Sequence, residues 1–161
     1  MSGLGYVWAA FASLLLASEI SAQSLRTAPD RVHILLGTYH AVPARTSFAY
    51  EETNPGLILT WDQAWRGLDV SAGLFENSFS DTSPLLAIGK TWPLERAVQG
   101  RALVALARYE EEDPIFQPLR NGWVLIPSLQ ISYRQIFAQV TPLPDPDNTG
   151  LIFAYGLEFE F

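Results

Sequence analysis

The C-terminal stretch FAYGLEFEF (Phe153–Phe161) alternates large apolar residues with small or acidic ones. Side chains of a β-strand point to opposite faces in turn, so this alternation predicts a strand with two unlike faces. In a soluble sandwich, the large side chains would form the core. In a transmembrane barrel, they would face lipid and the glutamates would face a polar interior. One face carries Tyr155, Leu157, Phe159 and Phe161, and the other carries Ala154, Gly156, Glu158 and Glu160.

Seven further apolar runs precede this one, separated by turn signals such as EETNPG, NSFSDTSP and PLPDPDNTG. Short runs that are rich in β-branched and aromatic residues and evenly spaced between turns predict an all-β fold. TPLPDPDNTG is expected to be a long loop before the last strand. The eight predicted strands are Val32–His40, Gly56–Asp62, Leu68–Asn77, Pro84–Trp92, Gln99–Tyr109, Trp123–Tyr133, Gln135–Thr141 and Gly150–Phe161.

Residues 1–22 have the pattern of a signal peptide. The apolar run Tyr6–Ala17 has the length of a signal-peptide core and is too short for a transmembrane helix. Small residues then favour cleavage after Ala22, which leaves residues 23–161 as one exported domain. No Lys or Arg precedes the apolar run, so a buried N-terminal helix is the alternative.

Several features favour the transmembrane barrel. The strand number is even, as in bacterial barrels. An exported chain without a long apolar helix can span a membrane only as a closed barrel, which satisfies every backbone donor. The terminal Phe161 resembles the aromatic ending of bacterial outer-membrane barrels. We therefore expect a monomeric, eight-stranded antiparallel barrel in the bacterial outer membrane. Six aromatic residues near strand ends fit interfacial girdles, or else an ordinary core: Tyr39, Trp61, Trp92, Tyr109, Trp123 and Tyr133.

Composition excludes other classes. The formal net charge of −7 gives no electrostatic basis for nucleic-acid binding. The chain has no cysteine and two histidines, so no metal site or other cofactor is predicted. Small residues on several strands could leave room inside the barrel for a slim ligand such as an acyl chain, and the alternative is a tightly packed interior without a cavity. These residues are Gly37, Gly73, Ala87, Gly89, Ala105, Ala107 and Gly156.

His40, Asn77 and Ser78 are the candidate reactive residues. His40 ends the first predicted strand and the other two end the third, so all three are expected at the same rim of the barrel. A histidine beside a serine can act as a general base on a hydroxyl. Asn77 could orient the histidine or stabilise an oxyanion. The alternative is ordinary turn chemistry.

The segments around these residues resemble the PagP family of outer-membrane lipid A palmitoyltransferases. Tyr39–His40, followed by SFAYEETN, is similar to the family's histidine segment and first loop. LFENSFSDTSPLLAIGKTW is similar to its serine motif. VLIPSLQISYRQIFAQVTPLP and NTGLIFAYGLEFEF are similar to its last strands.

The resemblance implies an eight-stranded barrel with an apolar interior pocket. It implies transfer of a palmitoyl chain from a phospholipid donor to lipid A as acceptor. The catalytic histidine, aspartate and serine would fall on His40, Asn77 and Ser78, and the glycine at the pocket floor on Gly89.

The departure at Asn77 keeps other functions open, because an amide carries no charge and cannot stabilise an imidazolium as an aspartate does. Asp81 is a possible substitute. The segment QSLRTAPDR is also too short for the amphipathic helix that the family carries before its first strand. The alternatives are a PagP-like barrel that binds lipid without transferring it and a soluble exported β-barrel binding module.

Overall fold

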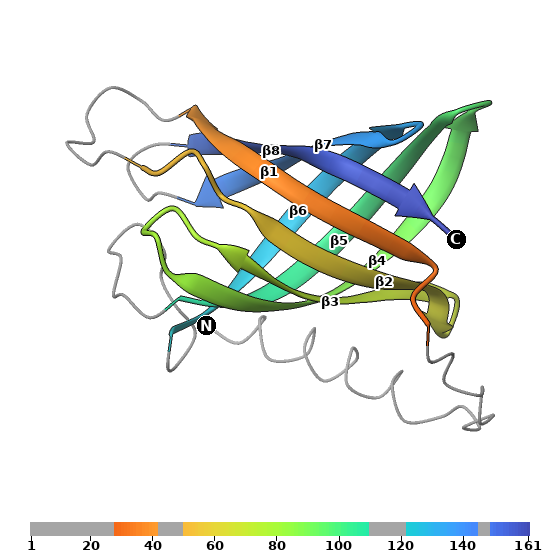
Figure 1. Cartoon of the computed structure of the whole chain (residues 1–161), viewed down its shortest axis with the longest axis horizontal. Helices are drawn as coiled ribbons and strands as arrows, with labels where there is room; N and C mark the ends of the chain where they lie inside the picture. Colours follow the sequence, from red (N-terminus) through yellow and green to blue (C-terminus); the bar gives the residue numbers. More distant parts are fainter. Residues whose placement is uncertain (1–27, 42–49, 110–121, 145–148) are drawn as a thin grey trace, which may run out of the picture.

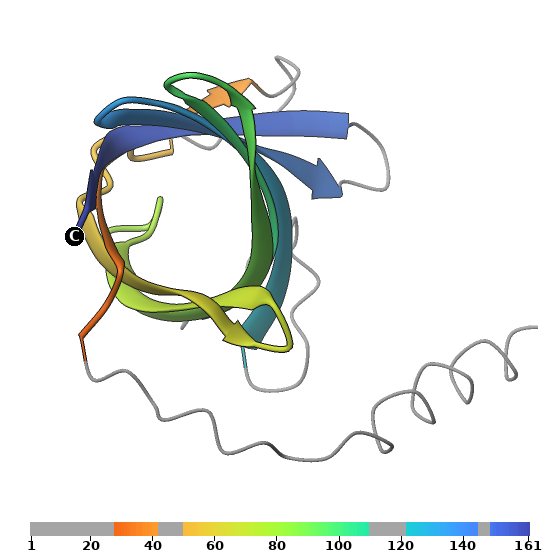
Figure 2. The ribbon, with the colours of Figure 1, turned by 90° about the vertical axis from the view of Figure 1, so that its right-hand side faces the viewer.

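Eight antiparallel strands close into a barrel in the computed structural model (Figures 1 and 2). Each strand pairs with the next, and β1 pairs with β8 to complete the ring. The structure describes residues 28–41, 50–109, 122–144 and 149–161. The strands are β1 (Arg31–Ala41), β2 (Gly56–Trp65), β3 (Leu68–Glu76), β4 (Thr82–Glu95), β5 (Val98–Arg108), β6 (Trp123–Tyr133), β7 (Ile136–Pro144) and β8 (Thr149–Glu160).

All eight predicted strands are confirmed, and β6 has the predicted bounds. β4 begins two residues before its predicted start and ends three residues after its predicted end, and β2 also ends three residues later than predicted. β7 continues through Pro142 and Pro144 into the expected loop. Both prolines pair with β8, as Pro142↔Leu151 and Pro144↔Thr149. The pairing of β7 with β6 ends at Val140, and proline is tolerated where an edge is unpaired.

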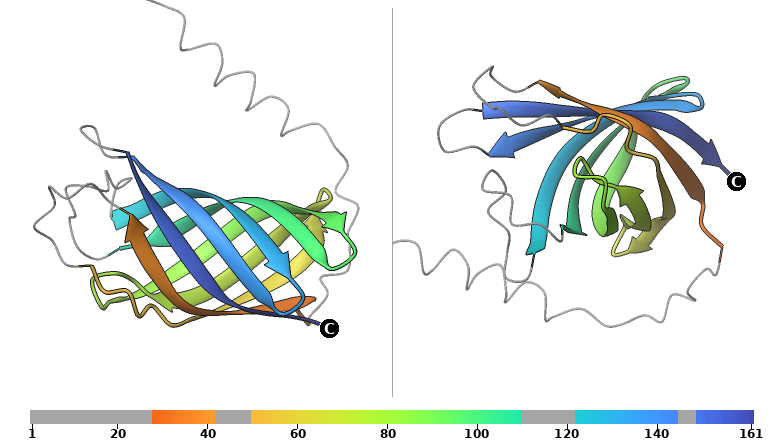
Figure 3. Two further views of the ribbon diagram at one scale, coloured as in Figure 1. Left: turned by 90° about the horizontal axis from the view of Figure 1, so that it is seen from above. Right: turned by 60° about the vertical axis from the view of Figure 1, so that its left-hand side comes forward.

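The two ends of the barrel differ in their connections (Figure 3). At one end, here called the turn end, β2–β3, β4–β5 and β6–β7 are joined by two-residue turns, and the last residue lies there too. The turn between Trp65 and Leu68 has φ values of 52° at Arg66 and 76° at Gly67. Positive φ at both central residues is typical of hairpin turns that match the strand twist. The longer connections are at the opposite end, here called the loop end.

The barrel is apolar outside, whereas its interior is polar at the turn end and apolar in its middle. The alternation of β8 is confirmed: Tyr155 is 49% exposed, whereas Glu158 is 2% exposed. Large apolar side chains on the other strands are exposed as well, including Leu74, Leu86 and Leu129. Of the predicted girdle residues, Tyr39, Trp92 and Tyr133 are exposed. Tyr109 instead faces inward and lines a cavity.

Charged and polar side chains fill the turn-end half of the interior. Asp69 accepts hydrogen bonds from Thr91 Oγ1 (2.6 Å), Arg31 Nη2 (3.2 Å) and the backbone of Gln63 (3.0 Å). Arg31 also pairs with Asp62. Because nearly every charge here has an opposite partner, these side chains can be buried. This group, the base network, consists of Arg31, His33, Asp62, Asp69, Thr91, Arg101, Gln130, Ser132 and Glu158.

Two seams of the barrel are paired only near the turn end. The β6–β7 ladder stops at Leu129↔Val140, although both strands continue toward the loop end. A hydrogen bond of 2.7 Å between Ser128 Oγ and Thr141 Oγ1 links the strands there. The β1–β2 ladder stops at Leu35↔Gly56. Beyond these points, the wall has no strand ladder at either seam.

The described part of the chain contains no helix that is long and apolar enough to cross a membrane. The predicted signal peptide, residues 1–22, lies outside the described residues.

Candidate functional site

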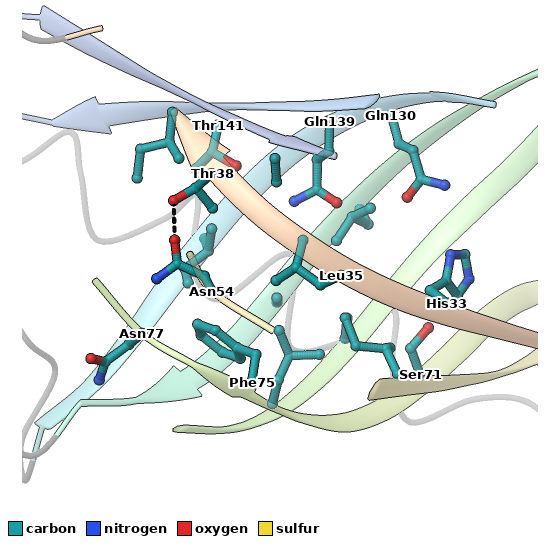
Figure 4. A pocket seen from close by; sticks show the side chains of 18 of the residues that line it. His33, Leu35, Thr38, Asn54, Ser71, Phe75, Asn77, Gln130, Gln139 and Thr141 are labelled. Atoms are coloured by element: carbon teal, nitrogen blue, oxygen red, sulfur yellow. Dashed lines mark hydrogen bonds between the residues drawn. The ribbon is translucent and has the colours of Figure 1, made fainter. Parts of the chain in front are cut away.

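A narrow cavity of about 110 Å³ runs inside the barrel from the loop end to the base network. Its middle is apolar because Leu85, Ala87, Leu103 and Ala105 face inward from β4 and β5. Figure 4 shows the order along its length: Asn77 lies at the loop end, Asn54 and Thr38 follow, and His33 lies at the far end. The small side chains of Ala87 and Ala105 leave the space that larger residues would fill.

Aromatic rings surround the mouth of this cavity. Tyr109 contacts Phe75 and Phe79 edge to face, with ring centroids 6.2 and 6.3 Å apart. Phe79 also contacts Tyr50. These rings come from β3, the loop after it, the end of β5 and the segment before β2. They form an apolar entrance to the barrel interior.

His40 and Ser78 meet at this entrance. His40 Nε2 lies 3.0 Å from Ser78 Oγ, within hydrogen-bond distance. The Tyr50 ring stacks on the imidazole, with centroids 4.3 Å apart and an interplanar angle of 9°. β1 and β3 reach the same rim with β2 between them, as predicted from the order of the strands. The pair therefore has the contact that a general base needs with a hydroxyl.

The other imidazole nitrogen has no orienting group among the described residues. His40 Nδ1 is buried, and no described residue forms a hydrogen bond with it. In a Ser-His-Asp triad, a carboxylate holds this nitrogen and stabilises the imidazolium. The described site is thus a dyad, in which the stacked Tyr50 ring restricts the orientation of the imidazole.

Asn77 structures the loop that carries Ser78. Its Oδ1 accepts hydrogen bonds from the backbone N–H groups of Phe79 (2.8 Å) and Asp81 (3.1 Å), and its Nδ2 donates to Ser83 Oγ (3.0 Å). The side chain is 2% exposed and also lines the cavity. No hydrogen bond joins Asn77 and His40 in the described structure. The described contacts of Asn77 thus position the loop rather than the histidine.

Gly89 lies on the inward face of β4, one inward position beyond Ala87. It is not among the residues that line the cavity. A Cβ at this position would lie 2.7 Å from the carbonyl oxygen of Ala102 and 2.9 Å from Leu103 Cβ. The glycine thus allows β4 and β5 to approach closely. Polar side chains line the turn-end part of the cavity: His33, Ser71, Arg101 and Gln130.

Two site residues, Tyr50 and Asn54, were not predicted. They lie between β1 and β2 in a segment without regular structure, which has no periodicity to indicate which side chains point inward. Backbone hydrogen bonds fix this segment, from Thr38 N to Glu52 O (2.9 Å) and from Glu76 N to Pro55 O (2.8 Å). The turn signal EETNPG was visible in the sequence, but it did not indicate that Asn54 would be buried.

In the described part of the chain, no group of three or more His, Asp or Glu side chains is placed to hold a metal ion. No family model matches the chain, and no curated protein sequence matches it.

Proposed function

We propose that this protein is an outer-membrane acyltransferase that moves a palmitoyl or similar chain from a phospholipid to lipid A. The observation that carries the proposal is the contact of His40 with Ser78 at the mouth of an apolar cavity. The resemblance to the PagP family supports the choice of donor and acceptor.

The distribution of side chains supports a membrane location. A soluble protein of this size rarely exposes apolar side chains around its whole circumference. Here Leu57, Leu86 and Leu129 are more than half exposed on three different strands, while charged residues are buried inside. This inverted arrangement is typical of transmembrane barrels. The longer loop end would face outward and the short turns inward, as in such barrels.

The site geometry supports acyl transfer. His40 Nε2 would accept the proton of an attacking hydroxyl, either that of Ser78 or that of the acceptor lipid. The hydroxyl oxygen forms a bond to the ester carbonyl carbon, and the bond to the lysophospholipid oxygen breaks. The imidazolium then returns its proton to that oxygen. With Ser78 as nucleophile, the acyl group would pass to the lipid A hydroxyl in a second, equivalent step.

The unpaired seams support access from the bilayer. A phospholipid acyl chain lies in the membrane, so it must cross the barrel wall to reach the cavity. Backbone hydrogen bonds between neighbouring strands would oppose that passage. The β6–β7 ladder has none on the loop-end side of Leu129 and Val140. Only the Ser128–Thr141 bond crosses there among the described hydrogen bonds.

The test uses the purified barrel in vesicles that contain lipid A and a phospholipid with palmitoyl chains. We expect lysophospholipid and palmitoylated lipid A to appear in equal amounts, and both to be lost in His40→Ala, which removes the base for either nucleophile. In Ser78→Ala, both are lost if Ser78 is the nucleophile and both are kept if the acceptor hydroxyl attacks directly. Lysophospholipid with free fatty acid in place of acylated lipid A would show hydrolysis and contradict the proposal. Heat-modifiable migration on gels confirms that each variant is folded.

A binding barrel without transferase activity is the second candidate. It is favoured by His40 Nδ1, which has no hydrogen-bond partner among the described residues, and by Asn77, which stands where the family has aspartate. Such a barrel would bind a lipid or detergent molecule in the same vesicles and release no lysophospholipid.

A further inference from the structure

Asn54 is buried in the wall of the cavity although it belongs to no strand. Its side chain is 1% exposed and lines the cavity together with Thr38 and Ser78. The backbone bonds of Thr38 to Glu52 and of Glu76 to Pro55 hold this segment between β1 and β3. The amide of Asn54 is therefore carried by a fixed backbone.

The oxygen of the Asn54 amide has a hydrogen-bond partner, whereas its nitrogen has none among the described residues. The Thr38 hydroxyl donates a hydrogen bond to Asn54 Oδ1. Figure 4 shows the amide nitrogen on the opposite side, directed away from Thr38. No described residue accepts a hydrogen bond from this nitrogen. Buried polar groups are almost always hydrogen-bonded, so a buried donor without a protein partner is available to an acceptor atom of a ligand or of a water molecule.

The position of this donor relative to the dyad is set by β1. Thr38 and His40 are two residues apart on one face of the strand, with the exposed Tyr39 between them. Thr38 is therefore about 7 Å from His40 along the strand, which is about 5 Å deeper along the axis of a barrel with tilted strands. An acyl ester whose chain occupied the apolar middle of the cavity would have its carbonyl between these two levels.

We infer that Asn54 Nδ2 binds the carbonyl oxygen of the acyl substrate and stabilises its oxyanion, an inference that rests on the proposed acyl transfer. When the hydroxyl attacks and its proton passes to His40, the carbonyl π electrons move to the oxygen that faces Asn54. The oxyanion then collapses and expels the lysophospholipid oxygen, which takes the proton back. Asn77 is less suited to this role, because hydrogen bonds to Phe79, Asp81 and Ser83 engage its amide.

The first test compares Asn54→Asp, which keeps the acceptor for Thr38 and removes the N–H donor, with wild type in the vesicle assay. We expect kcat to fall about 10²–10³-fold, the usual loss for an oxyanion donor. Asn54→Ser removes the amide without adding charge, and it gives the same result if the donor matters. Gln135→Glu makes the same amide-to-carboxylate change in the exposed β6–β7 turn, away from the cavity, and serves as the matched control.

The second readout is independent of turnover. Wild type is expected to bind a diacyl phospholipid up to about 10-fold more tightly than its dialkyl ether analogue, which lacks carbonyl groups. Asn54→Ser should abolish this preference and Gln135→Glu should keep it. If wild type shows the preference and Asn54→Ser loses it, but wild type transfers no acyl chain, Asn54 still binds the carbonyl group and the transferase proposal is wrong. Equal affinities in wild type, or an unchanged kcat in both Asn54 variants, would overturn the inference.

Discussion

The two halves of the barrel interior differ in how completely their polar groups are satisfied. In the turn-end half, Asp69 has three hydrogen bonds and Glu158 accepts from Gln130 and Ser132. Arg101 Nε has no hydrogen-bond partner in the described structure, but it lies 4.0 Å from Asp69 Oδ2, and Arg101 Nη2 donates to Ser71. In the loop-end half, His40 Nδ1 and Asn54 Nδ2 are buried without a hydrogen-bond partner in the described structure. An apolar cavity lies between these two regions.

This difference separates groups that hold the fold from groups that are available to a ligand. A charged side chain that forms hydrogen bonds or ion pairs with several strands links those strands across the interior. A buried donor or acceptor without a partner costs free energy in the empty protein. The turn-end half is therefore expected to determine stability and the loop-end half to determine chemistry.

Substitution of His40 should have the largest effect on chemistry. In His40→Ala the base is missing, so the rate of transfer in vesicles should fall about 10²–10⁴-fold. The urea midpoint of unfolding should change little, because the described contacts of His40 are with Ser78 and Tyr50 at the rim. A fall in the transfer rate of less than about 10-fold, or a large fall in the urea midpoint, would contradict the assignment of chemistry to the loop-end half and of stability to the turn-end half.

Asp69→Asn should have the largest effect on stability. It removes a negative charge next to Arg31 and Arg101 while preserving shape. Removing one partner from a buried ion pair typically costs about 3–5 kcal/mol in unfolding free energy. The rate of transfer per folded molecule should stay close to wild type. Urea unfolding in vesicles measures the first quantity, and an unchanged midpoint would show that the base network contributes little to stability.

Leu86→Arg tests the apolar exterior. Leu86 is exposed near the middle of β4, whereas Leu94 is exposed beside the β4–β5 turn. In a bilayer, arginine should cost about 2–4 kcal/mol at the first position and at most about 1 kcal/mol at the second. A soluble barrel would be insensitive to both changes, so equal small effects in vesicles would favour the soluble alternative.

Ala87→Leu should narrow the cavity. Ala87 lines it, and the added atoms would occupy the space available to an acyl chain, at an overpacking cost of about 1–3 kcal/mol. We expect the preferred acyl chain to become shorter. Gly89→Ala should lower stability without changing this preference, because its Cβ would meet the carbonyl oxygen of Ala102. A shorter preferred chain in the Gly89 variant alone would instead support the floor position that the resemblance implies.

Asn77→Asp should have the smallest effect. A carboxylate can accept the same two backbone hydrogen bonds, and the Ser83 hydroxyl can donate to it in place of accepting. We expect transfer to change less than about 3-fold, which is under 1 kcal/mol. Activity that appears only in Asn77→Asp would show that the parent barrel is a binding protein and that the acid is essential.

The strands could be predicted because alternation and turn residues are local signals. The alternation in β8 predicted which side chains face inward, and the structure confirms it for Tyr155 and Glu158. The end of β7 could not be predicted. Pro142 normally ends a strand, and its tolerance here depends on the unpaired seam with β6, which is a property of the tertiary structure.

The site was predictable only in part. The proximity of His40 and Ser78 followed from strand order, because strand ends at one rim lie close together. The role of Asn54 depends on how an irregular segment crosses the rim. Such a segment has no sequence periodicity from which its course could be predicted. The base network joins residues that are far apart in sequence, such as Arg31 and Asp69, so no local motif predicted their pairing.

The most direct measurement is the mass spectrum of lipid A from a bacterial outer membrane that contains the folded protein. With wild type, we predict a lipid A species heavier by one palmitoyl group, and with His40→Ala we predict none. An unchanged lipid A spectrum, with wild-type barrel present and folded in the same membrane, would contradict acyl transfer to lipid A.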